Sequence, residues 1–295
     1  MILLGGALLL AATVAPDPCP APRLEVSLSR AAAKQGAIVV VTLQSDVPLA
    51  SAKAEFEGRA AVLEHGGSPK VFRGLVGVDF ESKTGPASLT IETEGLCGDR
   101  HAASRPIDVR SGKFFVETLT VAPDYVEPPA SELARIHEDQ EKVARVWKSG
   151  GAERRWSGPF RLPVDAPVRE KSFGSRRVFN GESRSPHSGI DLAAHAGQDV
   201  DAPAPGRVAL AEDLYFSGGT IILDHGGGLF TSYFHLSRID VKVGDVVSGG
   251  DRIGAVGSTG RATGPHLHWS AKLGGARINP LGLLQLPVWP LEPQK

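Results

Sequence analysis

Two short segments in the C-terminal half of this chain, residues 187–191 (HSGID) and 264–269 (GPHLHW), most strongly constrain what it can fold into. A third, residues 233–236 (YFHL), lies between them. Together they place four histidines and one aspartate in a glycine-rich region. A catalytic zinc site uses three nitrogen or oxygen ligands in a roughly tetrahedral arrangement and leaves the fourth position to water. The set therefore suits a zinc site with two further histidines for proton transfer, in a fold that brings the segments together.

The spacing within each segment predicts how the side chains are arranged. His266 and His268 on a strand would project from the same face, roughly 7 Å apart. That separation is too long for both to bind one ion easily through bonds of about 2 Å, so one is expected to bind metal while the other reaches the reacting water. His187 and Asp191 would be about 13 Å apart in an extended chain. We expect Gly189 to let the chain bend and bring both to one metal.

The same three segments resemble the signature set of the lysostaphin/LytM-type zinc metallopeptidases, which cleave peptide cross-links in bacterial cell walls. The resemblance covers roughly residues 160–284 and extends to the connecting stretches 202–208, 224–226 and 244–247. It implies that His187, Asp191 and His268 are zinc ligands. It also implies that His235 and His266 are the catalytic histidines. The chain departs from the family pattern at none of these five positions.

The resemblance further implies a fold, a substrate and a mechanism. The expected fold of residues 160–286 is an antiparallel β-sandwich, the duplicated hybrid motif, whose open groove holds the metal. The expected partners are peptidoglycan stem peptides. The layout of an export segment and a spacer, without a recognisable Gram-positive wall-targeting repeat, favours a D-Ala–diaminopimelate cross-link as the bond cleaved, with an interpeptide glycine bridge or a shorter peptide as alternatives. Zinc would activate a water, one histidine would take its proton and later protonate the leaving amine, and the other would help to stabilise the oxyanion. Which histidine does which remains open at this stage, and Tyr233 is expected on the same strand face as His235, as a hydrogen-bond donor or groove lining.

Two alternative functions compete with an active endopeptidase. One is a catalytically silent wall-binding protein that activates another peptidoglycan hydrolase, and the intact five-residue set argues against it. The other is a structural or carrier module of the lipoyl or sugar-phosphotransferase hybrid-barrel type, which residues 243–254 suggest, but such modules lack the histidine–aspartate set. The remaining histidines are expected to be ordinary surface or core residues: His65, His101, His137, His195 and His225.

Composition indicates a mainly β protein without a strong electrostatic preference. The 35 glycines and 22 prolines among 295 residues predict many tight turns. The length suggests two units, each long enough to bury a core. A net charge of −1 gives no case for binding nucleic acid or an anionic membrane surface.

The first fifteen residues indicate export. Residues 1–15 are apolar and uncharged, as in a secretory signal peptide, and too short to span a bilayer as a helix. The run lacks a preceding Lys or Arg and is followed by Pro16, so the alternatives are retention as an N-terminal anchor and a true start that lies upstream. No other membrane insertion is expected. The expected location is the periplasm or cell envelope. The two cysteines, Cys19 and Cys97, predict one disulfide, with two free buried thiols as the alternative.

The N-terminal half has no catalytic motif. Residues 22–110 alternate short apolar strands with turn signals, and about seven strands predict an immunoglobulin-like β-sandwich that acts as a spacer or docking unit. Residues 111–158 form a linker, with a helix expected between Ser131 and Gly150. Its apolar positions favour packing on a domain face over binding to a separate partner.

Overall fold

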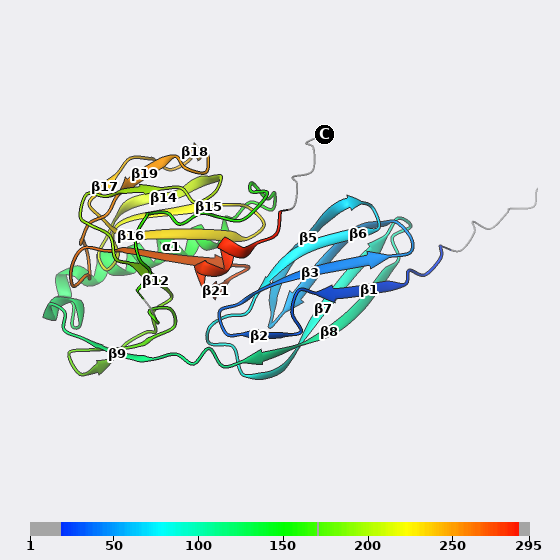
Figure 1. Ribbon diagram of the computed structural model, residues 1–295, viewed down its shortest axis with the longest axis horizontal. Helices are drawn as coiled ribbons and strands as arrows, with labels where there is room; N and C mark the ends of the chain where they lie inside the picture. Colours follow the sequence, from blue (N-terminus) through cyan, green and yellow to red (C-terminus); the bar gives the residue numbers. More distant parts are fainter. Residues whose placement is uncertain (1–18, 170, 289–295) are drawn as a thin grey trace, which may run out of the picture.

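The computed structural model describes residues 19–169 and 171–288, so the expected leader or anchor at residues 1–15 lies outside the described part. The described chain is mainly β, with an N-terminal and a C-terminal β region and a helix between them (Figure 1), which confirms the predicted fold class. None of the described helices is long and apolar enough to cross a membrane.

The N-terminal region is one eight-stranded sheet that folds over a single apolar core. Alternation of buried and exposed residues, clearest in LASAKAEF of the fourth strand, gives each strand one inward face. Core side chains come from all eight strands, including Leu43, Phe56, Phe72 and Ile91. The sheet order is β1-β3-β6-β5-β4-β7-β8-β2. The strands are β1 (Leu24–Leu28), β2 (Ala32–Lys34), β3 (Ile38–Ser45), β4 (Leu49–Phe56), β5 (Arg59–Ser68), β6 (Val71–Gly77), β7 (Gly85–Gly95) and β8 (Arg100–Arg110).

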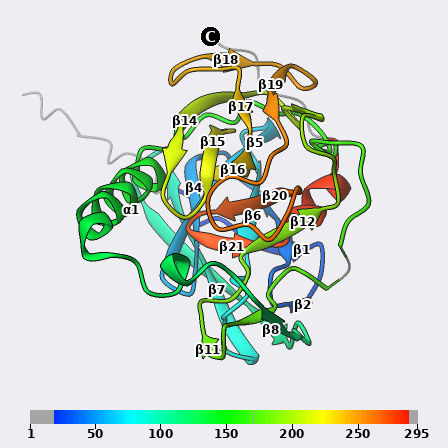
Figure 2. The ribbon, with the colours of Figure 1, turned by 90° about the vertical axis from the view of Figure 1, so that its left-hand side faces the viewer.

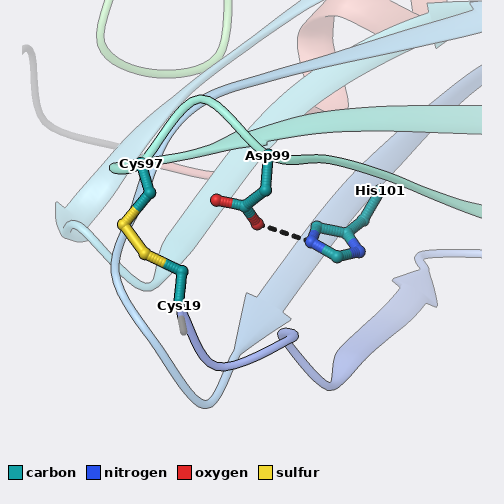
Figure 3. Close-up of a disulfide and its surroundings, with 4 residues drawn as sticks. All are labelled: Cys19, Cys97, Asp99 and His101. Carbon is teal, nitrogen blue, oxygen red and sulfur yellow. Dashed lines mark hydrogen bonds and ion pairs between the residues drawn. A yellow bond between two sulfur atoms is a disulfide. The ribbon is translucent and has the colours of Figure 1, made fainter. Parts of the chain in front are cut away.

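A disulfide closes this region. Cys19 is bonded to Cys97, which lies in the turn between β7 and β8 (Figure 3). The bond confirms the predicted pairing over the alternative of two free thiols. It joins residues 78 positions apart, and constraining a loop of that length in the unfolded chain stabilises the fold by about 4–5 kcal/mol in the chain-entropy model.

The C-terminal region is built on a second antiparallel sheet with the order β12-β20-β16-β15-β14-β18 and with β21 paired to β20. A three-stranded sheet, β13-β19-β17, lies against it and shares its apolar core. The strands are β12 (Gly189–Leu192), β13 (Asp199–Asp201), β14 (Gly206–Leu214), β15 (Gly218–Asp224), β16 (Leu229–Leu236), β17 (Arg238–Ile239), β18 (Val246–Val247), β19 (Arg252–Ala255), β20 (Leu267–Leu273) and β21 (Ala276–Ile278), and the 3-10 helix η3 (Pro280–Gln285) follows.

The connecting segment is packed against the C-terminal region. Helix α1 (Leu133–Lys148) begins and ends close to the predicted positions and lies beside β14 (Figure 2). Its Val143, Val146 and Trp147 pack against apolar residues of β14–β16. Upstream of it, β9 (Val116–Leu119) pairs in parallel with β10 (Arg176–Phe179), which also pairs with β11 (Glu182–Ser183). Figure 1 shows β9 beside the C-terminal sheets and not with the N-terminal strands. Two 3-10 turns, η1 (Pro123–Tyr125) and η2 (Ala130–Glu132), lie between β9 and α1.

The two β regions are in direct contact. Asp79, just after β6, is 2% exposed and accepts hydrogen bonds from Arg277 of β21: 2.8 Å from the backbone N, 3.0 Å from Nε and 2.8 Å from Nη2. Ile38, Leu75 and Phe80 join the apolar core of the C-terminal region. Apolar contacts and an ion pair with the buried Asp79 carboxylate therefore fix the N-terminal sheet to the C-terminal one.

Candidate metal centre and its histidines

The pairing of two strands brings the predicted ligands together. In the antiparallel pair β12–β20, Asp191 lies directly opposite His268. His187 precedes β12 by two residues, so His187, Gly189 and Asp191 alternate along nearly extended chain and lie on one face. Side chains far apart in sequence thus converge because their strands are neighbours.

Gly189 does not act as the predicted bend. It is the first residue of β12, and its backbone is not in the left-handed region. Its role is to leave space: a Cβ there would lie 2.6 Å from His268 Nε2 and 2.5 Å from the Trp269 carbonyl oxygen. The His268 imidazole fills the space above Gly189, and the chain has no turn between His187 and Asp191. The prediction of a turn was wrong because it assumed that the side chains of His187 and Asp191 could not span the separation of their backbones in an extended chain.

Three ligand atoms converge in this place. Distances between them are 2.6 Å from His187 Nε2 to His268 Nδ1, 3.1 Å from His187 Nε2 to Asp191 Oδ1, and 3.2 Å from His268 Nδ1 to Asp191 Oδ1. Atoms bonded to one tetrahedral zinc at about 2.0–2.1 Å lie about 3.3 Å apart. All three residues are buried, and together they form a group that could hold a metal ion.

The hydrogen bonds around His187 show why a cation fits there. Its Nδ1 lies 2.8 Å from the Ser172 carbonyl oxygen, which can only accept, so Nδ1 carries the proton. In the neutral imidazole, Nε2 is then an acceptor, and it lies close to the acceptor Oδ1 of Asp191. This close contact requires either a proton on Nε2, which then donates to Asp191, or another positive charge between the two atoms. A metal ion bound to both atoms would supply it, so the residues present fit a metal.

Burial and charge set the ionisation of these groups. Burial acts to raise the pKa of Asp191, but hydrogen bonds and charge from His187 and His268 hold it well below its usual 3.8. Burial, with the neighbouring His187, lowers the pKa of His268 to about 3. The ligand set is therefore an anionic carboxylate with a neutral His268 imidazole, the protonation states that metal binding requires.

His235 reaches the site through an unusual backbone conformation. Regular alternation along β16 would place it on the same face as Tyr233, as predicted, but its φ is +66°. Its ring centre lies 4.9 Å from that of His266 and 6.2 Å from that of His268. Tyr233 instead points into the core, is 0% exposed, and its hydroxyl lies 2.7 Å from Thr231 Oγ1. The prediction for Tyr233 was wrong because it assumed an unbroken strand.

The two remaining motif histidines, His235 and His266, have the same type of hydrogen bond and the same direction of pKa shift. Nδ1 of His235 donates to the Thr259 carbonyl oxygen, and Nδ1 of His266 donates to the Gly264 carbonyl oxygen, each at 2.8 Å. Burial, with the charge of His266, lowers the pKa of His235 to about 4, and burial lowers that of His266 as well. Both rings are therefore neutral near pH 7, and each keeps Nε2 as a proton acceptor. Nε2 of His266 lies 3.7 Å from Asp191 Oδ1, next to the ligand set.

The other histidines lie outside this group, and so does Asn180, in the turn between β10 and β11. His225 is fully buried and hydrogen-bonds through its two ring nitrogens to the Pro205 carbonyl oxygen and to Thr231. His195 is exposed. The Asn180 side chain hydrogen-bonds the backbone of Val121 in both directions and so holds the end of the linker strand.

Sequence reasoning missed three neighbours of the site. Arg177 Nη2 donates to Asp191 Oδ2 at 3.0 Å, Ser172 accepts from His187, and Phe234 stacks on the His268 ring with centres 5.0 Å apart. Phe234 could have been found from its place beside His235 on a strand. No local pattern marks Arg177, because it lies on β10, which pairs with neither of the strands β12 and β20 that carry Asp191 and His268.

Comparisons with known proteins agree with this arrangement. Residues 185–280 match the model of peptidase family M23. The chain is 40% identical over 121 residues to the peptidoglycan DD-endopeptidase ShyA of Vibrio cholerae, covering 40% of this chain and 28% of ShyA. It is 42% identical over 97 residues to the DD-carboxypeptidase/endopeptidase Mpg of Neisseria meningitidis, covering 33% of this chain and 22% of Mpg. It thus spans about a quarter of the length of these curated relatives.

A solved structure extends the similarity to both β regions. A crystal structure described as a peptidase M23 from Pseudomonas aeruginosa is 29% identical, with a TM-score of 0.66, and the match covers 85% of this chain and 94% of that one. The matched family segment contains all five motif residues, and strand pairing gathers them at one place. Residues 185–280 of this chain, which hold the metal-ligand group and both further histidines, are therefore similar to peptidase family M23.

Proposed function

We propose that this protein is a zinc-dependent endopeptidase that hydrolyses peptide cross-links of bacterial peptidoglycan. The observation that carries the proposal is the convergence of His187 Nε2, Asp191 Oδ1 and His268 Nδ1 beside two neutral histidines. The substrate class follows from the relatives ShyA and Mpg, whose names describe DD-endopeptidase and DD-carboxypeptidase/endopeptidase activity. Within that class we propose the D-Ala–diaminopimelate cross-link as the bond.

His187, Asp191 and His268 would hold the zinc ion. Two nitrogen ligands and one oxygen ligand leave a fourth tetrahedral position for water or substrate, as in catalytic zinc sites. When bound, zinc supplies Lewis-acid chemistry, lowering the pKa of water toward 7 and polarising a carbonyl. The Ser172 carbonyl fixes the tautomer and orientation of His187, so its Nε2 faces the metal position.

His235 and His266 would transfer the protons. Each presents a neutral Nε2, so each can take a proton from the attacking water and later give it to the leaving amine. The histidine that is not acting as the base can donate to the developing oxyanion once protonated. His266, next to Asp191, is the nearer of the two to the ligand set, and its removal is the direct test of proton transfer.

The silent wall-binding protein is disfavoured by the same geometry. Each of the five motif positions carries a side chain able to play its catalytic role, all five are buried, and His235 and His266 lie next to the group of three ligands. We propose that residues 160–286 carry the reaction, that residues 22–110 and the linker at 111–158 position them, and that the protein acts in the periplasm or cell envelope. The Cys19–Cys97 disulfide supports an oxidising compartment.

Digestion of purified sacculi tests the proposal. Full-length protein loaded with zinc should release monomeric muropeptides from walls with D-Ala–diaminopimelate cross-links, identified by mass spectrometry. The His268→Ala variant should release none above background, while the exposed His195→Ala variant should match the wild type. Equal release by the wild type and His268→Ala would refute the proposed site, and binding without cleavage by the wild type would favour the silent protein.

A further inference from the structure

The two carboxylate oxygens of Asp191 face different partners. Oδ1 lies 3.1 Å from His187 Nε2 and 3.2 Å from His268 Nδ1, whereas Oδ2 accepts a hydrogen bond of 3.0 Å from Arg177 Nη2. The side chain of Asp191 is 5% exposed and that of Arg177 is 18% exposed. One oxygen thus belongs to the ligand set, and the other is occupied by a guanidinium in a largely buried setting.

Strand β9, which precedes helix α1, holds Arg177 in place. Its Nε donates to Glu117 Oε2 at 3.1 Å, and Ser175 Oγ donates to the same oxygen at 3.3 Å. Glu117 on β9 and Arg177 on β10 are direct partners in the parallel strand pair. The planar guanidinium therefore connects the linker strand to Asp191 through two different nitrogens, a geometry that a lysine cannot reproduce.

We propose that Arg177, held by Glu117, is a positioning residue for Asp191 and sets the metal affinity of the centre; this inference rests on the proposed function. A carboxylate with both oxygens free can rotate and offer either one. With Oδ2 fixed by Arg177, only Oδ1 faces His187 and His268. Groups that orient metal ligands in this way typically contribute about ten- to hundredfold to metal affinity.

Charge explains why Glu117 is part of the arrangement. A lone guanidinium on Asp191 would cancel the negative charge that attracts a metal ion. Glu117 neutralises Arg177, so the three side chains together keep one negative charge next to the ligand atoms. Strand β9 thus contributes to the metal centre through Glu117, although it lies in the segment 111–158, which was predicted to be only a linker.

The experiment measures zinc affinity in the full-length protein by competition with a chromogenic chelator. Arg177→Met should weaken zinc binding about ten- to hundredfold because Asp191 loses its orienting partner. Glu117→Gln keeps the size of the side chain but removes its charge, and should weaken binding in the same direction by a smaller factor. Matched controls are Arg176→Met, an exposed arginine on the same strand, and Glu182→Gln, whose partner is Arg184; both should stay within about twofold of the wild type.

Thermal unfolding in the presence of a chelator separates orientation from folding. A purely structural role would lower the melting temperature of the metal-free variants and leave the zinc affinity of the folded protein unchanged. Unchanged or tighter zinc binding by both Arg177→Met and Glu117→Gln would overturn the inference, and tighter binding would mean that Arg177 competes with the metal. A wild-type protein that takes up no zinc would refute the metal centre itself, a result distinct from the failure of these two variants.

Discussion

Gly189→Ala is the substitution whose effect the structure defines most closely. The added methyl would lie 2.5 Å from the Trp269 carbonyl oxygen and 2.6 Å from His268 Nε2, where ordinary contact begins at 3.4 Å. The strands β12 and β20 must therefore open by about 0.9 Å at this point. One obstacle is backbone and the other is a ligand ring packed against Phe234, so neither can move aside freely.

The opening has a cost in stability and a larger cost in metal binding. Overpacking a filled core destabilises by about 1–3 kcal/mol, and about 2–4 °C of melting temperature is lost per kcal/mol in a domain of 150–250 residues. Metal–ligand distances tolerate changes of only about 0.2 Å. A displacement of His268 several times larger should weaken zinc binding by at least about tenfold.

Chelator competition and thermal unfolding measure both effects. The matched control is Gly264→Ala, because a Cβ at Gly264 meets nothing within 4 Å and its carbonyl still accepts from His266. We expect this control to keep wild-type zinc affinity. A Gly189→Ala protein with wild-type affinity and melting temperature would refute the explanation that Gly189 is needed for the close approach of His268.

Two further predictions concern proton transfer and the contact between the β regions. His266→Ala should keep its zinc and lose hydrolysis of sacculi by about a hundredfold; loss of zinc would instead make His266 a ligand, and near-normal activity would exclude both roles. Asp79→Asn should lower the free energy of unfolding by about 1.5–3 kcal/mol at pH 7, because a buried charged acceptor of the Arg277 hydrogen bonds is lost. Burial acts to raise the pKa of Asp79, but hydrogen bonds from Arg277 hold it below 3.8, so this stability is present above the unfolded pKa and is lost as the pH falls through the folded one. Urea unfolding should therefore show a smaller gap between wild type and variant at pH 3 than at pH 7, and a constant gap would contradict the assignment.

The features of the site that could be predicted from the sequence are those that depend on the spacing of residues within a short segment. The His-x-x-x-Asp and His-x-His patterns carry the identity of the converging residues, and alternation along the strands carries the mainly β fold. Helix α1 was predictable because its apolar positions repeat at helical spacing and Gly150 follows its end. The disulfide was predictable because the chain has only two cysteines.

What escaped prediction depends on contacts between distant segments or on a single backbone angle. The positive φ at His235 reverses the expected direction of its side chain, and no residue in the segment 233–236 predicts this backbone angle. The pairing of β9 with β10, which places Glu117 beside Arg177, has no local signal because parallel strands join segments far apart in sequence. The Asp79–Arg277 pair likewise depends on how two β regions meet.

Zinc content of the purified full-length protein tests the central claim most directly. The wild type should carry close to one zinc per chain by elemental mass spectrometry, because three ligands and an open position bind zinc tightly only together. His187→Ala and Asp191→Ala should each lose it, and the exposed His195→Ala control should keep it. Full zinc occupancy in both ligand variants would contradict the assignment of the metal centre.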